Sequence, residues 1–157
     1  MANTYSQCYM HLIFAVRNRD ALILDSWSSE LEKYITGIVQ DEGHKLIAIG
    51  TAHDHIHIFI GYNTIKSIPK LMEQIKTSSN NWIKQRKLSP FKFSWQNGYG
   101  CFSHSHSQID SVAKYVLTQR EHHKKKSFKD EYLSILNKND IAFEERYLFD
   151  FFERVSL

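Results

Sequence analysis

The chain has 157 residues, a formal net charge of +3 at pH 7 and 42% hydrophobic residues. This size and composition predict one domain, residues 1–157, with a buried core, and they argue against a disordered or fibrous chain. The longest apolar run, Leu12 to Val16, is far shorter than the ~20 residues that a membrane span requires. The N-terminal residues lack the basic and apolar regions that are typical of a secretory leader, so we expect a cytoplasmic protein in which Cys8 and Cys101 stay reduced.

The apolar pattern of the N-terminal half predicts three strands and a helix. Ser28 or Ser29 is suited to cap this helix, and Gly43 to end it. The expected elements are a strand from Tyr5 to Val16, a helix from Trp27 to Asp41, and strands from Leu46 to Ala52 and from His55 to Tyr62.

The C-terminal half predicts further helices around one short strand. Pro69 fits the first turn of the helix that begins at Ser67. We expect helices over Ser67 to Lys87, Gln108 to His122 and around Tyr132 to Leu136, a strand within residues 91–102, and a final aromatic cluster (Tyr147, Phe149, Phe151, Phe152) that docks on the body or on a partner.

This order of elements is typical of the split βαβ pattern of a ferredoxin-like α+β sandwich. We therefore expect an antiparallel sheet with helices on one face, followed by a C-terminal helix that carries Tyr115. A fold of this kind hosts many functions, so the chemistry has to come from particular residues.

The sharpest chemical feature is the triplet His55-Ile56-His57 in an apolar run. Residues two apart on a strand point to the same face, so both imidazoles project together. Such a pair can hold one metal ion from one side. Two ordinary polar positions on a half-buried strand are the alternative. Asp54, just before the pair, would at most orient an imidazole.

A second feature is the spacing of Tyr115 and Gln119, four residues apart on a predicted helix and hence on one face. Tyrosine offers a phenolic oxygen as nucleophile, and the neutral amide oxygen of glutamine can complete a metal site. A core aromatic on an amphipathic helix is the commoner role for a lone tyrosine.

Together these residues resemble the HUH transposases with one catalytic tyrosine, which are encoded by the smallest insertion sequences and beside palindromic repeats. The resemblance covers nearly the whole chain. It rests on His11 before Arg17 and Arg19, on Asp54-His55-Ile56-His57, on Trp95-Gln96-Asn97-Gly98-Tyr99, and on the Tyr115 to Gln119 helix.

The resemblance implies a site and a reaction. His55, His57 and Gln119 would bind Mg²⁺ or Mn²⁺, which polarises the scissile phosphate. Tyr115 would attack the phosphorus, giving a 5′-phosphotyrosyl link that a 3′-hydroxyl later reverses. Relatives recognise hairpins in single-stranded DNA and act as homodimers, in which the tyrosine helix can complete the partner's site.

Basic side chains are the predicted contacts to the DNA backbone, since clustered cations bind phosphate by releasing counterions. A solvated helix face is the alternative for each cluster. The candidates are Arg17, Arg19, Lys84, Arg86, Lys124, Lys125 and Lys126.

The other histidines are weaker candidates. His104 and His106 alternate like the first pair but fall at a helix entry, where Ser105 or Ser107 can serve as cap. We interpret His122 and His123, which close the tyrosine helix, as structural, and expect His11 in a substrate or packing role.

Two rival functions stay open. A metal-dependent phosphoesterase would hydrolyse a small substrate with Tyr115 as a mere hydrogen-bond donor. A binding module would hold hairpin DNA without cutting it. Among catalytic relatives, an insertion-sequence transposase and a repeat-associated housekeeping version are close alternatives, and we favour the transposase.

Overall fold

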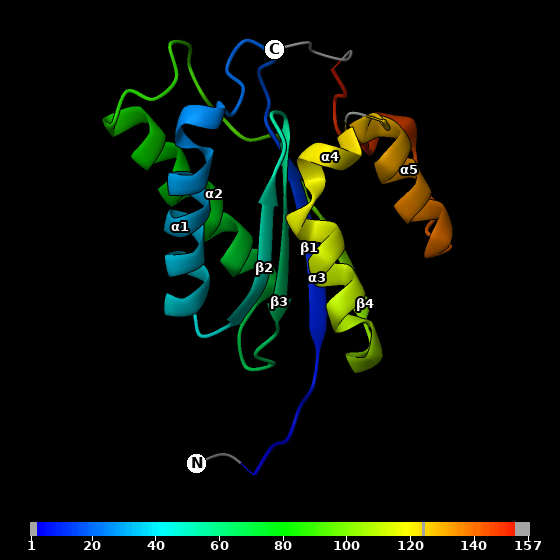
Figure 1. The fold of residues 1–157 in the computed structure, drawn as a ribbon. Coiled ribbons are helices and arrows are strands. Elements are labelled where there is room, and N and C mark those ends of the chain that lie inside the picture. Colours follow the sequence, from blue (N-terminus) through cyan, green and yellow to red (C-terminus); the bar gives the residue numbers. More distant parts are fainter. Residues whose placement is uncertain (1–2, 124, 153–157) are drawn as a thin grey trace.

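Four antiparallel strands form one sheet in the order β2-β3-β1-β4 (Figure 1). The structure, a computed structural model, describes residues 3–123 and 125–152. With helices between the strands, this order is that of the predicted ferredoxin-like α+β fold. The strands are β1 (Tyr9–Ala15), β2 (Lys45–Thr51), β3 (His55–Gly61) and β4 (Gly100–His104).

Alternation along the two central strands separates the faces of the sheet. On β3, Ile56 and Ile58 belong to the main hydrophobic core, so His55 and His57 point to the opposite face. All four side chains are fully buried. Both faces of the sheet are therefore covered by other elements.

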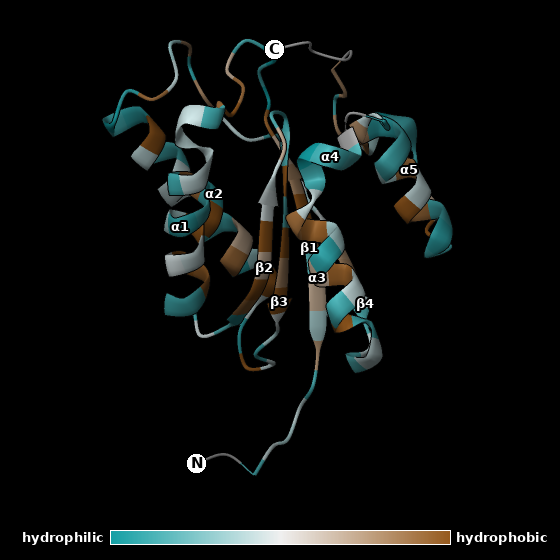
Figure 2. Ribbon diagram, viewed as in Figure 1, coloured by the Kyte–Doolittle hydropathy of each residue, from teal (hydrophilic) through white to brown (hydrophobic). Residues whose placement is uncertain are grey.

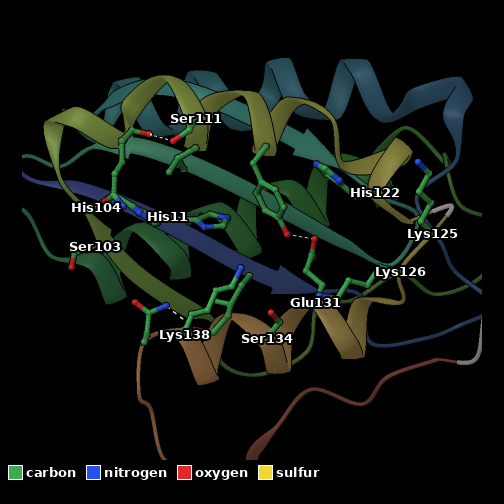
Figure 3. Close-up of a pocket in the computed structure, with 15 residues that line it drawn as sticks. His11, Ser103, His104, Ser111, His122, Lys125, Lys126, Glu131, Ser134 and Lys138 are labelled. Atoms are coloured by element: carbon green, nitrogen blue, oxygen red, sulfur yellow. Dashed lines mark hydrogen bonds between the residues drawn. The ribbon is translucent and has the colours of Figure 1, made fainter.

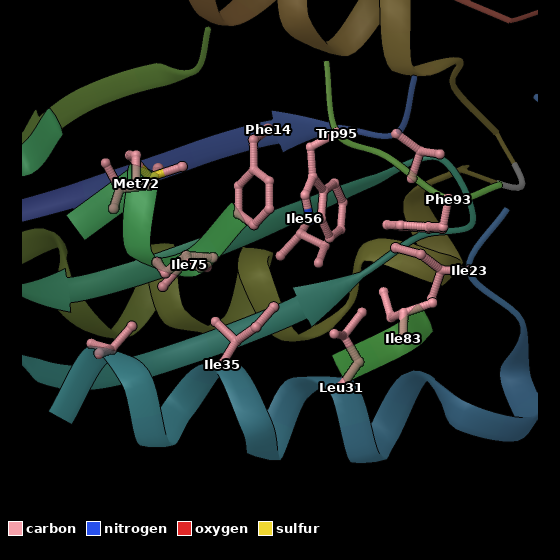
Figure 4. Close-up of a cluster of buried hydrophobic side chains, with 14 of the residues drawn as sticks. Phe14, Ile23, Leu31, Ile35, Ile56, Met72, Ile75, Ile83, Phe93 and Trp95 are labelled. Atoms are coloured by element: carbon pink, nitrogen blue, oxygen red, sulfur yellow. The ribbon is translucent and has the colours of Figure 1, made fainter. Parts of the chain in front are cut away.

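The helices α1 (Asp25–Asp41) and α2 (Ile68–Gln85) cover the first face. Figure 4 shows Phe14 and Ile56 from the sheet packed with Trp95, Ile35 and Ile75 in this core. In Figure 2 the strands are largely hydrophobic, whereas α1 carries long hydrophilic stretches. Burial of this apolar area is the main contribution to stability.

A serine caps α2 but not α1. The Ser67 side chain accepts a hydrogen bond from the Lys70 amide at the start of α2. The expected serine cap of α1 was wrong. This helix begins after Leu24, which makes no side-chain cap, and Ser28 lies inside its first turn.

The second face carries α3 (Ile109–Leu117), α4 (Gln119–His123) and α5 (Phe128–Lys138). Val116 of α3 packs with Ala48 and Phe59 over β2 and β3, and α5 packs over β1 and β4. Gly50 permits the approach of α3, because a Cβ there would lie 1.8 Å from the Val116 carbonyl oxygen. Both helices thus flank the strip of sheet that carries His55 and His57.

The single helix expected from Gln108 to His122 is divided. His106–Gln108 form a 3₁₀ turn, α3 ends at Leu117, and Thr118 leaves the helical conformation at φ −107° and ψ 28°. The Thr118 hydroxyl donates back to the Lys114 carbonyl, a bond that bends helices. As a result Gln119 begins a new helix rather than continuing the one that carries Tyr115.

Two residues of the C-terminal aromatic cluster dock on the body of the protein, one of the two predicted alternatives. Phe149 is buried against Phe128 and Tyr132 of α5, and Phe151 packs beside them. Tyr147 is 75% exposed and does not join this packing. Among the described residues, no helix is long and apolar enough to cross a bilayer. Cys8 and Cys101 are free thiols.

Candidate active site

The two histidines of the triplet lie side by side on β3, as their spacing predicts. His55 and His57 are both fully buried, and their ring centroids are 5.1 Å apart. A central strand fixes their backbone on both sides, because β3 pairs with β1 and with β2. The site is therefore built on a rigid element rather than on a loop.

Each imidazole uses its Nδ1 atom for a neighbouring side chain. His55 Nδ1 lies 2.7 Å from an oxygen of Asp54, and His57 Nδ1 lies 2.6 Å from Nε2 of His11. Asp54 thus orients an imidazole, the role that the sequence allowed it, and His11 packs on the site from β1. The Nε2 atoms of both imidazoles face a common point.

That common point is occupied by Glu131 of α5, which the sequence analysis missed. Its Oε1 atom lies 3.0 Å from His57 Nε2 and 3.5 Å from His55 Nε2. Only 4% of Glu131 is exposed. A signal was present in the sequence. Phe128, Tyr132, Ile135 and Leu136 mark an apolar helical stripe, and position 131 falls on it, where a carboxylate needs a partner.

This donor set fits a divalent metal ion. Ligand atoms of His55, His57 and Glu131 lie within 4.8 Å of one another, and all three residues are buried. Two imidazole nitrogens with one carboxylate oxygen are a common combination for first-row transition metals. The Asp54 carboxylate behind His55 is also typical of metal-binding histidines.

Gln119, the third ligand predicted from the sequence, is buried next to the tyrosine helix. Its amide nitrogen donates to the Tyr115 carbonyl oxygen at 3.1 Å, and 1% of the residue is exposed. Its role as a metal ligand stays a prediction.

Tyr115 lies beside the histidines of its own chain. Its ring centroid is 5.9 Å from that of His57, and its hydroxyl donates a hydrogen bond to Oε2 of Glu131. Burial and the adjacent Glu131 carboxylate raise the pKa of the Tyr115 phenol above its ordinary value. The side chain is therefore a neutral phenol at neutral pH, and it needs help to act as a nucleophile.

Two further histidines line the site. The ring of His122 lies 4.8 Å from that of Tyr115, and the ring of His104 lies 6.0 Å from that of His11. Neither contact followed from the sequence, where we interpreted His122 as structural only. Both rings can contact a ligand that reaches the tyrosine.

The surrounding charges set the protonation of the buried imidazoles. Burial alone would lower the pKa of His55, but the Asp54 and Glu131 carboxylates outweigh it and raise that pKa to about 9. Burial and the neighbouring His57 hold the pKa of His11 well below its ordinary value. His11 is therefore neutral and can accept a hydrogen bond from His57.

Residues of α3, among them Tyr115, and residues of α5, among them Glu131, line a cleft of about 700 Å³. Figure 3 shows this cleft. Its outer wall is basic, with Lys125 and Lys126 at one end and Lys138 on α5. The lining residues are His11, Ser103, His104, Gln108, Ser111, Val112, Tyr115, His122, Lys125, Lys126, Glu131, Ser134, Ile135, Lys138 and Asn139.

The basic residues predicted from the sequence fall into three places. Lys125 and Lys126 line the cleft. Arg17 and Arg19 line a separate pocket of about 480 Å³ together with Lys92.

Neither basic residue near the end of α2 lies in the cleft or in that pocket. Arg86 pairs with Glu30 at 3.1 Å and lies over the Trp82 ring, so its charge is partly used within the protein. Lys84 is exposed on the last turn of α2. Lys124 lies outside the described residues.

Comparison with known proteins bears on the family and on the fold of the chain. The family model described as transposase, IS200-like, matches residues 4–119. The match ends before α5, so Glu131 lies outside it. Among curated proteins, none matches the chain closely enough for comparison.

Two solved structures share the fold. A transposase candidate from Deinococcus radiodurans R1 superposes with a TM-score of 0.60 at 18% identity, covering 76% of this chain and 96% of its own. A REP-associated tyrosine transposase bound to a REP hairpin superposes with a TM-score of 0.58 at 15% identity, covering 100% of this chain and 98% of its own.

Proposed function

We propose that this chain, which belongs to the IS200-like transposase family, cuts and rejoins single-stranded DNA through a covalent bond between DNA and Tyr115. One observation carries the proposal. The Tyr115 hydroxyl and both histidines of the triplet converge on one buried carboxylate within a single chain. A tyrosine that served only to fill the core would not point its hydroxyl into a histidine site.

The phenol is the nucleophile in this proposal. Its oxygen attacks the scissile phosphorus, a 5′-phosphotyrosyl bond forms, and the broken phosphodiester leaves a 3′-hydroxyl. A second 3′-hydroxyl attacks the phosphotyrosine and releases Tyr115, so the energy of the bond is kept and no ATP is consumed. Glu131 Oε2 holds the hydroxyl, which orients the oxygen that must attack.

The histidine pair would hold a divalent ion, Mg²⁺ or Mn²⁺, with Gln119 as the third ligand predicted from the sequence. When bound, such an ion acts as a Lewis acid that withdraws charge from the phosphate oxygens. The protein's part is to orient the imidazoles. Asp54 does this for His55 and His11 does it for His57.

The basic cleft is suited to the DNA strand that is cut. Lys125, Lys126 and Lys138 can neutralise phosphates, and the rings of His104 and His122 can contact bases near Tyr115. A REP hairpin is bound in one of the similar structures, and we propose a DNA hairpin as the recognition element here. The pocket with Arg17 and Arg19 is a second candidate for backbone contacts. Assembly as a homodimer stays a prediction.

The experiment that tests the proposal is a search for the covalent intermediate. Purified protein is mixed with labelled single-stranded hairpin oligonucleotides from the DNA that flanks its gene, with Mn²⁺ present. We expect a protein–DNA adduct that survives denaturing electrophoresis and disappears with Tyr115→Phe, His57→Ala or chelator. A matched control, Tyr5→Phe, changes a tyrosine that is 98% exposed and should leave the adduct unchanged.

The same gel separates the rival functions. Cleaved product without an adduct at any time would favour the metal-dependent phosphoesterase. Tight hairpin binding with neither adduct nor cut would favour the binding module. Either result would contradict the proposed chemistry.

A further inference from the structure

Glu131 is the buried carboxylate of this site, and the site residues predicted from the sequence did not include it. It lies on α5, beyond residue 119 where the match ends. A buried carboxylate is costly unless charges or hydrogen bonds compensate it. Glu131 lies between two imidazoles and a phenol, and these groups compensate its burial.

The two oxygens of Glu131 face different partners. Oε1 faces His55 Nε2 and His57 Nε2, at 3.5 and 3.0 Å, whereas Oε2 accepts the hydrogen bond of Tyr115. A carboxylate can bind a metal through one oxygen and accept a hydrogen bond through the other. The arrangement therefore leaves Oε1 on the side of the metal donors while Oε2 keeps its contact with the nucleophile.

We propose that Glu131 is itself a protein ligand of the divalent ion, which makes this a two-histidine, one-carboxylate centre that prefers Mn²⁺ to Mg²⁺. This deepens the proposed function, on which it rests for the presence of an ion between the histidines. Imidazole nitrogens suit first-row transition metals, whereas Mg²⁺ demands oxygen ligands and keeps much of its water. The negative charge of Glu131 raises the affinity for both ions, so the preference for Mn²⁺ over Mg²⁺ comes from the two histidines.

A consequence for α5 follows. Apolar contacts of Phe128, Tyr132 and Leu136 also attach this helix to the sheet. The Phe128 ring stacks on the His55 ring, with 3.8 Å between the ring centroids. A metal bond from Glu131 would tie this helix to β3. The bound ion would then fix the position of α5, whose residues Ser134 and Lys138 line the cleft (Figure 3).

The test measures metal binding without DNA. The free Mn²⁺ signal in electron paramagnetic resonance gives the affinity of the metal-free wild-type protein, of Glu131→Gln and of Gln119→Ala. Glu131→Gln keeps the size of the side chain and removes its charge, and we expect affinity for Mn²⁺ to fall at least about tenfold. Glu73→Gln, an exposed change on α2, is the control that should bind as wild type. Competition with Mg²⁺ should require a large molar excess.

Hydrogen exchange gives the second readout. Mn²⁺ should slow exchange of the amides of α5 in the wild type and not in Glu131→Gln, and thermal melting in chelator shows that the variant is folded. Equal Mn²⁺ affinity for Glu131→Gln and wild type would overturn the proposal, as would equal affinity for Mg²⁺ and Mn²⁺. A loss confined to Gln119→Ala would also overturn it. The metal-binding test contains no DNA, so its result does not depend on adduct formation. Failure to form the covalent adduct would refute the proposed function but not the role of Glu131 as a metal ligand.

Discussion

Gly50→Ala tests whether the tyrosine helix lies where the structure has it. Gly50 lies on β2 beneath α3, and an added Cβ would be 1.8 Å from the Val116 carbonyl oxygen and 2.9 Å from its carbon. These are backbone atoms, so no side chain can rotate to relieve the clash. To reach an ordinary contact of 3.4 Å, α3 has to recede by roughly 1.5 Å.

The expected cost has two parts. Overpacking of this kind typically destabilises a protein by about 1–3 kcal/mol, which lowers the melting temperature of a chain of this size by roughly 2–12 °C. Tyr115 is the residue next to Val116, and a displacement of about 1 Å can slow a positioned reaction ~100-fold. We therefore expect the rate of adduct formation to fall far more than the fraction of folded protein.

Thermal melting and single-turnover adduct formation measure the two parts. The control is Gly37→Ala inside α1, where the added Cβ meets no heavy atom within 4 Å apart from its chain neighbours and the nearby helix backbone. Alanine is the better helix former, so this change should raise stability by up to ~1 kcal/mol and leave the rate unchanged. If Gly50→Ala were as stable and as fast as wild type, α3 would not rest on β2 and the position of Tyr115 would be wrong.

Three further changes probe other parts of the structure. Ser79→Ala removes the buried acceptor of the Trp95 indole N–H, 2.9 Å away, and should cost about 1–3 kcal/mol in urea unfolding, whereas a loss below ~0.5 kcal/mol would contradict that bond. Burial lowers the pKa of Lys76 from 10.5 to about 8, so the unfolded chain binds more protons between these values. The stability of wild type relative to Lys76→Met should therefore rise from pH 8 to 10.5, and a flat difference would refute the shift. Asp54→Asn should weaken Mn²⁺ binding about 10- to 100-fold without unfolding the protein, and unchanged binding would show that Asp54 does not orient His55.

The sequence predicted the sheet and the histidine pair because their signals are local. A period of two along His55 to Ile60 places imidazoles on one face and isoleucines on the other, whatever packs above them. The fold class followed from the order of the elements along the chain, because strand, helix, strand, strand, helix, strand is the order of a split βαβ sandwich. Ser67 and Pro69 marked the start of α2 for equally local reasons.

The remainder of the site depends on contacts between distant parts of the chain. Glu131 reaches His57 across 74 residues, and no local pattern names that partner. The end of α3 at Thr118 was not predicted, because Tyr115 and Gln119 are four residues apart, as on one continuous helix. The hydrogen bond from the Thr118 hydroxyl to the Lys114 carbonyl bends the backbone between them. The position of Glu131 on the apolar stripe of α5 was visible in the sequence. Its partners, the two histidines of β3, could be identified only from the structure.

The central claim is that Tyr115 forms a covalent bond to DNA, and peptide mapping of the adduct tests it most directly. The trapped protein–DNA species is digested with protease and nuclease, and mass spectrometry locates the remaining nucleotide. We predict a phosphate-linked nucleotide on the peptide that contains Tyr115, attached through its 5′ end. A nucleotide on any other residue, or an attachment through the 3′ end, would contradict the account.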